Sequence, residues 1–537
     1  MKLLFSNPVS FAAAARRHRG INPPDHKQAS LRSVLMDMPL PRLLYFPLCL
    51  TGKEPAYPLV KPGYSVLKGQ LLAASTDGND NLVHASTSGR IVALASHPRP
   101  DPFGSNGETL ILEADGEDRW IALHPATDWQ TLPATEIRSR ICRAGIDERN
   151  DCGLSRWNHA RQPEILIINA LETEPYLTAD QALIRSHAKE LLTGAGILQL
   201  ACGALRCIIA ITSEKSDAIA ALYTALQESG QQAGIEVMVL PPRYPITDRQ
   251  LIDAVTGGRV PVEQPESERG AVLADVTTTM AVRDAVIDGR PMLSRVTTVC
   301  GNTLRTPKNF RALLGTPVGF LLELCGIDYQ NLDRLVMGGS LTGFTLHSFD
   351  VPIVKSSTCV IAAAAGEFPA PVTAGPCIRC DACVPSCPVG LLPQNLYQAV
   401  KNERQDLMTG LRLDDCIECG ACAYVCPDHI PLVQYFRAGK AVLSREARQI
   451  ELSEYRSKRF EARRQRLARD TAMRRGSRRR SVARPENPDI QDSGLKTFSR
   501  TRAREEIAAA VARVQQRRRN AGKATARPRD PDQDGRS

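Results

Sequence analysis

Continuous hydrophobic runs alternate with helical patterns between residues 130 and 290. EILIINA at 164–170, CIIAITS at 207–213 and EVMVLP at 236–241 have the length and apolar content of buried strands. The segments between them, DQALIRSHAKELLTGAGILQLA and DAIAALYTALQESG, carry apolar residues at helical spacing. Buried strands that alternate with helices are typical of a parallel sheet covered on both faces. We therefore predict a Rossmann-like α/β layer over residues 126–290.

Residues 36–125 carry a different pattern, in which glycines separate short runs such as LVKPGYSVLKGQLLAAS and NLVHASTSGRIVALA. Gly63, Gly69 and Gly89 predict tight turns, because glycine adopts a positive φ at little steric cost. The pattern predicts a small β unit. Its core is expected to come from Val60, Val66, Leu67, Val83 and Ile91.

Two shorter regions lie on either side of the α/β layer and the β unit. Residues 1–35 are polar and broken by Pro23 and Pro24, so we expect an N-terminal arm that lies on another part of the chain. From 296 to 327 the pattern changes to a strand, a turn and a helix, which predicts a small separate unit at 291–335. The segment MGGSLTGF at 337–344 predicts a glycine-rich turn region.

The C-terminal tail is rich in arginine and poor in large apolar side chains. Residues 441–537 hold 27 Lys and Arg against 13 Asp and Glu, while the whole chain has a net charge of +10, so the basic character belongs to the tail. Such a segment is either an exposed helix or disordered. Ile507, Val511 and Val514 fall on one face of a short helical pattern. Attraction to anionic lipid and a plain solvated extension are both open, whereas the scarcity of aromatics disfavours nucleic acid.

Length and composition predict several globular domains. The chain has 537 residues, of which 43% are hydrophobic and 23% charged, which excludes fibrous and wholly disordered classes. No apolar stretch reaches the roughly 20 residues that cross a bilayer. The best candidate, residues 197–211, is short and contains Arg206. The apolar run near the start is broken at 6–8, so we expect no secretion signal.

Half of the 16 cysteines lie in two identical patterns, CIRCDACVPSCP at 377–388 and CIECGACAYVCP at 416–427. Three cysteines at spacings of three reach different irons of one 4Fe–4S cube, and in two-cluster ferredoxins the fourth cysteine binds the other cluster. Structural zinc, the alternative, usually takes two separated pairs of ligands. We predict two 4Fe–4S centres, one bound by Cys377, Cys380, Cys383 and Cys426, the other by Cys387, Cys416, Cys419 and Cys422.

The other eight cysteines have no ligand spacing and are expected to be mostly buried small hydrophobes. They are Cys49, Cys142, Cys152, Cys202, Cys207, Cys300, Cys325 and Cys359. Cys142 and Cys152 lie in a polar stretch where exposure is possible, and we assign them no role.

The order of these features resembles the RnfC subunit of the Rnf (Rsx) ion-translocating electron transport complex. The resemblance covers most of residues 1–440 through RGINPPDHK, VKPGYSVLKGQ, HASTSGRIVAL, EADGEDRW, INALETEPYLTAD, LGTPV, MGGSLTGFTL and the cysteine region through IPLVQYFR. It implies a multidomain α/β and α+β fold. Its parts would be an N-terminal arm at 1–35, a biotinyl- or lipoyl-like barrel-sandwich domain at 36–125, an α/β domain similar to the flavin and NADH subunit of respiratory complex I at 126–290, a β-grasp unit at 291–335, a two-cluster ferredoxin-like helical domain at 336–440 and the tail at 441–537.

The resemblance also implies an FMN and NADH site, with Glu172 and Glu174 at the family's acidic positions. Three glycine sites of that pocket are altered here. The loop AGIDERNDCGLSRW at 144–157 retains Gly145 and Gly153 but adds Asp147, Glu148 and Asp151; Ile246, Thr247 and Asp248 replace a glycine pair after Pro245; and DVTT at 275–278 replaces Asn-Val-Gly-Thr. Because glycine lets backbone amides close on a phosphate, we expect FMN and NADH to bind weakly or not at all.

The function that the resemblance implies is that of a peripheral subunit of a membrane-bound oxidoreductase complex that couples electron transfer to ion translocation. It would lie on the cytoplasmic side of the bacterial inner membrane and pass single electrons through its two clusters. Its partners would be the membrane subunits and a second iron–sulfur subunit of an Rnf-type complex. The alternatives are a soluble NADH:acceptor oxidoreductase, which needs an intact nucleotide loop, and a non-catalytic docking or assembly protein with structural clusters.

Overall fold

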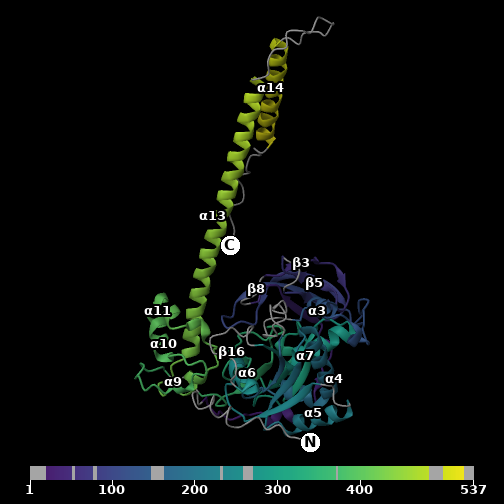
Figure 1. Ribbon diagram of the computed structural model, residues 1–537, viewed down its shortest axis with the longest axis vertical. Coiled ribbons are helices and arrows are strands. Elements are labelled where there is room, and N and C mark those ends of the chain that lie inside the picture. The colour runs from purple at the N-terminus through teal and green to yellow at the C-terminus, as the bar shows by residue number, and fades with distance from the viewer. Residues whose placement is uncertain are drawn as a thin grey trace, which may run out of the picture. The chain divides into compact units, whose positions relative to one another are not determined.

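The computed structural model describes residues 20–50, 55–76, 81–146, 163–229, 234–257, 270–369, 373–482 and 500–524 (Figure 1). The chain divides into two compact units, Met1–Ala447 and Arg448–Ser537. The first unit contains all the strands of the described ranges, in four sheets.

Two small antiparallel sheets form the β unit near the N-terminus. One has the order β2-β8-β7-β4 and the other β3-β5-β6. Gly63 and Gly69 adopt the expected positive φ, 95° and 84°. Gly89 instead begins a strand, where a Cβ atom would lie 2.1 Å from the Glu113 carbonyl oxygen, so close backbone approach requires glycine there. The strands are β2 (Leu43–Pro47), β3 (Tyr57–Pro58), β4 (Ser65–Val66), β5 (Leu71–Ala74), β6 (Val83–His84), β7 (Gly89–Pro98) and β8 (Asn106–Ala114).

The core of this β unit agrees with the expected positions except at one residue. Val60, Val66 and Ile91 are buried, and Val83 packs against the same cluster at its edge. Leu67 is 37% exposed, which corrects the expectation that it belongs to the core. Adjacent side chains of an extended segment point to opposite faces, and Val66 at the end of β4 is buried, so Leu67 next to it points outward.

The α/β layer contains a parallel four-stranded sheet in the order β11-β10-β9-β12, as predicted. Its strands are β9 (Ile165–Ala170), β10 (Arg206–Thr212), β11 (Ile235–Leu240) and β12 (Ala271–Asp275). Successive residues of β9 enter different cores: Leu166 and Ile168 pack with α4, and Ile167 packs with α6. The helices are α3 (Ala134–Arg143), α4 (Ala179–Cys202), α5 (Ser216–Glu228), α6 (Asp248–Thr256) and α7 (Val276–Arg283), with short turns at Trp129–Thr131 and Asp284–Asp288.

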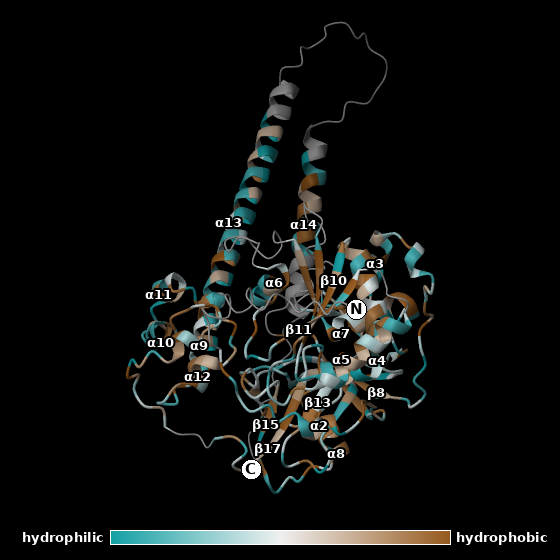
Figure 2. Cartoon of the chain, turned by 60° about the horizontal axis from the view of Figure 1, so that its bottom comes forward, coloured by the Kyte–Doolittle hydropathy of each residue, from teal (hydrophilic) through white to brown (hydrophobic). Residues whose placement is uncertain are grey.

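A mixed six-stranded sheet follows, in the order β1-β14-β13-β17-β15-β16. It contains the strand and helix predicted at 296–327, as β13 and α8, and continues beyond residue 335 to β17. Strand β17 consists of apolar residues and is mostly buried, whereas β13 and β15 mix apolar with polar residues (Figure 2). The elements are α2 (Gln28–Leu31), β1 (Met36–Asp37), β13 (Ser294–Cys300), β14 (Lys308–Leu313), α8 (Val318–Leu324), β15 (Leu332–Met337), β16 (Phe344–Thr345) and β17 (Cys359–Ala364).

The cysteine region is helical and has its own small core. Leu396, Leu413 and Phe436 are fully or almost fully buried there, together with Cys387 and Cys422. The elements are α9 (Cys383–Ser386), α10 (Pro393–Lys401), α11 (Gln405–Gly410), a turn at Leu413–Asp415, α12 (Ala421–Tyr424) and the start of α13 (Leu432–Val482).

The second unit is the arginine-rich tail, and the helical alternative is the one observed over its described residues. It contains the continuation of α13 from Arg448 and α14 (Arg500–Ala524). Side chains 448–475 are all exposed, and Figure 2 colours this part of α13 mainly as hydrophilic. Ile507, Val511 and Val514 are each more than half exposed. Across the described residues, no helix combines the length and apolar character needed to cross a membrane.

Candidate metal centres

The two cysteine runs fold in the same way, as their identical spacing predicts. In each run the third and fifth residues take left-handed backbone conformations: Arg379 and Asp381 in the first, Glu418 and Gly420 in the second. A short helix then begins, at Cys383 in the first run and at Ala421 in the second. The two runs therefore share the same loop conformation before their short helices.

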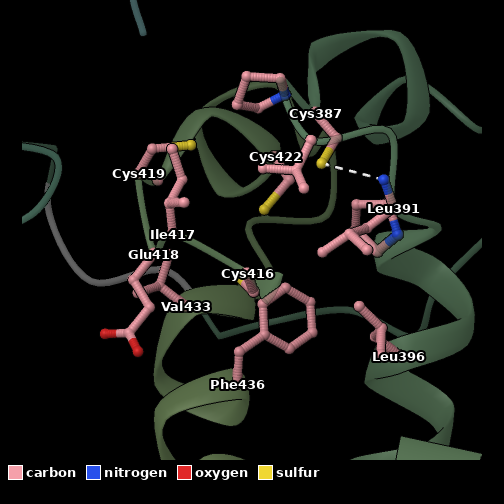
Figure 3. A pocket seen from close by; sticks show the side chains of 14 residues that line it. Cys387, Leu391, Leu396, Cys416, Ile417, Glu418, Cys419, Cys422, Val433 and Phe436 are labelled. Atoms are coloured by element: carbon pink, nitrogen blue, oxygen red, sulfur yellow. Dashed lines mark hydrogen bonds between the residues drawn. The ribbon is translucent and has the colours of Figure 1, made fainter. Parts of the chain in front are cut away.

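Four cysteines from the two runs line a single pocket. Cys387 of the first run lines this pocket together with Cys416, Cys419 and Cys422 of the second (Figure 3). The other lining side chains are mainly apolar and include Val389, Leu391, Leu396, Val433 and Phe436. The structure therefore brings together the four cysteines that the sequence grouped as one predicted centre.

The apolar wall of this pocket disfavours free thiolates. Burial raises the pKa of Cys419 to about 11 and raises the pKa of Cys422 further. The backbone N–H of Leu391 donates a hydrogen bond to Cys387 Sγ at 3.4 Å (Figure 3). A metal that takes up these sulfurs as thiolates would supply the compensating positive charge and release protons.

The other four predicted ligands lie at the more exposed side of the same core. Cys377, Cys383 and Cys426 are partly buried against it, while Cys380 is exposed. Burial raises the pKa of Cys383, and the nearby Cys380 and Cys377 contribute to that rise. The backbone N–H of Gly375 donates to Asp428 O at 3.1 Å, which brings the start of the first run beside the end of the second, where Cys426 lies.

No group of three or more His, Cys, Asp or Glu side chains in the described ranges converges as it would around a single metal ion. The ligands of a 4Fe–4S cube bind different irons and therefore surround the cluster instead of converging on a point. The pocket of Cys387, Cys416, Cys419 and Cys422, with its mainly apolar wall and sulfur donors, fits such a group.

A charged cluster that the sequence analysis missed holds the second cysteine loop. Glu418 accepts hydrogen bonds from Arg437 Nε at 2.8 Å and from Lys440 Nζ at 3.0 Å. Lys440 also donates to the carbonyl oxygen of Cys416. Although burial opposes ionisation, these bonds and charges lower the pKa of Glu418. The only sequence signal was a basic pair at helical spacing after the second run.

Glu172 caps a helix at the carboxyl edge of the parallel sheet. Its carboxylate accepts hydrogen bonds from the backbone N–H groups of Asp180 at 2.8 Å and Gln181 at 3.2 Å, at the start of α4. The buried Lys215 lies 3.4 Å from the same carboxylate. Lys27 donates to the Glu172 carbonyl oxygen, so the N-terminal arm lies on this edge. The carboxylate of Glu172 is thus bonded to groups of this same chain, at the start of α4 and at Lys215.

Two altered glycine sites also form helix caps. Thr247 accepts a hydrogen bond from Gln250 N at 3.1 Å in a capping box that begins α6. Asp275 accepts from Thr278 N at 2.5 Å and caps α7. Gly145 has a positive φ of 66°. The remaining residues of the first altered loop, Asp147, Glu148, Asp151, Cys152 and Gly153, lie outside the described residues.

The carboxyl edge of the parallel sheet has features that favour a bound phosphate and features that oppose it. Helix N-termini favour phosphate, but those of α4 and α7 are capped by Glu172 and Asp275. Burial, followed by these two carboxylates, raises the pKa of Asp180. Arg295 is 5% exposed, and its Nε and Nη1 have no hydrogen-bond partner in the described part of the chain; Asp275 lies 3.7 Å away. One guanidinium with unsatisfied nitrogens therefore lies near two carboxyl groups, those of Asp275 and Asp180.

Glu174 binds the glycine-rich segment 337–344. Its carboxylate accepts hydrogen bonds from the backbone N–H of Leu341 at 3.0 Å and of Thr342 at 2.7 Å, and from the Thr342 hydroxyl at 2.6 Å. Burial raises its pKa, and these hydrogen bonds partly offset the rise. Its predicted role in an FMN or NADH pocket stays a prediction.

The remaining cysteines follow the default expectation in the described ranges. Cys202, Cys207, Cys300, Cys325 and Cys359 are buried, Cys49 is partly buried and Cys142 is exposed.

Three family models match successive parts of the chain. Residues 15–117 match the RnfC barrel sandwich hybrid domain, residues 153–284 match the Nuo51 FMN-binding domain, and residues 373–475 match the 4Fe-4S dicluster domain. The prediction of iron–sulfur clusters is confirmed by the last match, and the flavin implied by the resemblance is supported by the second.

Curated relatives extend over most of the chain. The RnfC subunit of the ion-translocating oxidoreductase complex of Pseudomonas aeruginosa is 37% identical over 86% of this chain, which spans only 60% of that relative's length. The subunit of the same name from Yersinia pestis bv. Antiqua is 38% identical, and the match covers 84% of this chain and 73% of the Yersinia protein. A chain of an NAD+-reducing [NiFe]-hydrogenase matches at a TM-score of 0.42 and 16% identity, over 59% of this chain and 64% of the hydrogenase chain. On the identity and coverage of the relatives, the chain belongs to the RnfC family of ion-translocating oxidoreductase complex subunits.

Proposed function

We propose that this protein is a peripheral electron-carrying subunit of a membrane-bound complex that couples electron transfer to ion translocation. The observation that carries the proposal is the pocket lined by one cysteine of the first run and three of the second. Crossed sharing of this kind is characteristic of two-cluster ferredoxin modules. Family membership supplies the complex to which such a carrier belongs.

In this proposal Cys387, Cys416, Cys419 and Cys422 bind one 4Fe–4S cluster. When bound, the cluster supplies a one-electron acceptor and donor. The chain's own groups then set its surroundings: the Leu391 N–H donates to Cys387 Sγ, and the apolar wall with Val433 and Phe436 limits access of water. Hydrogen bonds to sulfur and solvent exposure are among the factors that set the reduction potential.

The second cluster is proposed to be bound by Cys377, Cys380, Cys383 and Cys426. Cys380 and its neighbours Ile378 and Arg379 are exposed, which would place this cluster near the protein surface. An electron carrier needs at least one centre accessible to its partner. The proposed partners are the membrane subunits and a second iron–sulfur subunit of an Rnf-type complex, at the cytoplasmic side of the bacterial inner membrane.

The basic tail is proposed to strengthen attachment to an anionic membrane surface. Residues 448–475 form an exposed stretch of α13 in which basic side chains outnumber acidic ones. Each basic residue close to such a surface contributes roughly 1 kcal/mol, and the attraction fades beyond a Debye length of about 8 Å at physiological salt.

FMN and NADH are proposed to bind this chain more weakly than the family pattern implies. Glu172 and Asp275 cap the helices whose N-termini would otherwise be open to a phosphate, and Asp180 adds a third carboxyl group. Two observations oppose weak binding: residues 153–284 match the Nuo51 FMN-binding domain, and the unsatisfied guanidinium nitrogens of Arg295 suit an anion. Flavin content after gentle purification and NADH titration of the cluster-loaded chain test this point; stoichiometric FMN with NADH-dependent cluster reduction would contradict it.

The main test is metal analysis combined with fractionation of cells. Two cubes require about eight iron and eight sulfide per chain. Reduced protein should give the electron paramagnetic resonance signals of two interacting clusters, and the protein should be membrane-bound and released by salt. Iron near four per chain would refute the two-cluster proposal. A protein that is freely soluble and oxidises NADH would favour a soluble oxidoreductase instead.

A further inference from the structure

A continuous hydrogen-bond path connects Glu174, at the edge of the α/β layer, with the second cysteine loop. We propose that Glu174 is a positioning residue for the cluster site of Cys387, Cys416, Cys419 and Cys422, acting through the glycine-rich segment 337–344. This inference rests on the proposed function, because it concerns one of the two cluster sites. It also gives segment 337–344 a role that its sequence alone did not indicate.

The first step is the contact between Glu174 and the segment. Three donors from Leu341 and Thr342 converge on the carboxylate at 2.6–3.0 Å. Gly339 lies so close that a Cβ atom there would be 2.0 Å from Glu174 Cδ. The segment is therefore wrapped around this side chain, and its conformation depends on a short residue at 339 and an acceptor at 174.

The second step leads from the segment to the cysteine loop through charged side chains. The Thr342 carbonyl oxygen accepts a hydrogen bond from Arg437 Nη2 at 2.6 Å, and Arg437 Nε donates to Glu418 at 2.8 Å. Lys440 binds the other oxygen of Glu418 and the carbonyl oxygen of Cys416. Arg437 is 13% exposed on its side chain, so this part of the path is largely shielded from water.

The third step is direct packing of the segment on the loop. A Cβ atom on Gly420 would lie 2.7 Å from the Leu341 carbonyl oxygen, so the two backbones are in close contact. Leu341 also belongs to an apolar cluster with Ala421 and Tyr244. The Tyr244 hydroxyl donates to the Cys419 carbonyl oxygen at 2.6 Å. Polar and apolar contacts thus fix the same three residues, 419–421.

The first cysteine loop does not share this environment. Its residues at the positions of Glu418 and Gly420 are Arg379 and Asp381, and both are exposed. An effect of Glu174 should therefore appear at one cluster and not at the other. This selectivity separates a positioning role from general loss of folding.

The test compares three variants of the full, cluster-loaded chain. Glu174→Ala removes the acceptor, and Glu174→Gln retains its shape, because the amide oxygen accepts both backbone N–H groups and the amide nitrogen donates to the Thr342 hydroxyl. Glu367→Ala is the matched control, since Glu367 also accepts backbone N–H bonds, from Asn302 at 2.8 Å and Ala364 at 3.0 Å, in the same sheet region. The readouts are amide hydrogen exchange and the reduction potential of each cluster.

We expect Glu174→Ala to speed amide exchange of residues 416–422 about tenfold or more, because segment 337–344 would no longer hold the loop in place. The potential of the cluster at this loop should become more positive, since added water stabilises the more negatively charged reduced form. Glu174→Gln should restore both values, and Glu367→Ala should change neither. The inference is overturned if Glu174→Ala leaves 416–422 and that potential unchanged, or if Glu367→Ala has the same effect. If wild-type protein holds only four irons, the proposed function fails, while exchange at 416–422 still decides the coupling.

Discussion

Substitution of Gly420 by alanine tests how much the contact with Leu341 contributes to the free energy of opening of the second cysteine loop. Gly420 has a φ of +78°, and an added Cβ atom would lie 2.7 Å from the backbone carbonyl oxygen of Leu341. The left-handed conformation costs an alanine roughly 1–2 kcal/mol. Overpacking against backbone that cannot rotate away costs about 1–3 kcal/mol more. The loop should therefore open more easily by about 2–5 kcal/mol in total.

Gly366→Ala is the matched control, because Gly366 has a φ of +83° but no atom within 4 Å of the added Cβ. It should show only the conformational cost. The difference between the variants is the contact term, which corresponds to roughly fivefold to more than hundredfold in the opening equilibrium at about 1.4 kcal/mol per decade.

The assay for both glycine variants is native-state amide exchange of the substituted loop, with iron retention measured after a chelator challenge. Gly420→Ala should lose the iron of one cluster first, while Gly366→Ala should retain both clusters. Equal opening free energies in the two variants would refute the contact between Gly420 and Leu341 as an energetic constraint.

Three other predictions follow from the cysteine grouping, a buried histidine and the tail. Cys387→Ser should lower iron from about eight to about four per chain and leave the cluster of Cys377, Cys380 and Cys383 intact. Cys426→Ser should instead leave the cluster of Cys416, Cys419 and Cys422 intact. Iron content and electron paramagnetic resonance spectra that show the reverse would refute the crossed pairing. Burial, followed by the charge of Lys355, lowers the pKa of His84 from 6.5 to about 3. The buried neutral imidazole therefore contributes its full stability to the fold above pH 6.5, and this contribution is lost as the pH falls toward 3. Unfolding should therefore become easier by up to about 1.4 kcal/mol per pH unit below 6.5, and His84→Asn should reduce that slope in denaturant titrations; an unchanged slope would count against the assignment. A chain that ends at Ala447 should keep its iron and leave membranes at lower salt, and identical salt release would reduce the tail to a solvated extension.

The sequence was sufficient to predict those parts of the fold in which one local pattern determines the structure. The strand EILIINA and its neighbours form the parallel sheet as expected, since continuous burial on both faces admits few other arrangements. The cysteine spacing likewise identified the group around the pocket, because the loop geometry repeats with the sequence. The expectation for Leu67 is wrong because adjacent residues of an extended segment point to opposite faces, so Val66 and Leu67 cannot both enter the same core.

Long-range contacts were beyond the reach of local patterns. Arg437 and Lys440 look like ordinary exposed helix residues, and only the fold brings them to Glu418. Glu172 and Glu174 were placed beside a nucleotide pocket by resemblance. Their hydrogen bonds to α4 and to segment 337–344 depend on where those elements lie in space. Helix capping by Thr247 and Asp275 shows the same limit, because the sequence of these loops does not reveal that their side chains cap α6 and α7.

The proposed sharing of cysteines between the two runs has a consequence for how the protein would acquire its clusters. In the proposed assignment, a cluster that takes Cys387 from one run and three ligands from the other would tie together chain segments that are distant in sequence. The entropy of closing that loop is lost once, so the first cluster to be inserted leaves the cysteines of the second site already close together. Iron loading should then be cooperative. Under limiting iron, a population of fully loaded and empty chains is expected instead of chains that carry one cluster each.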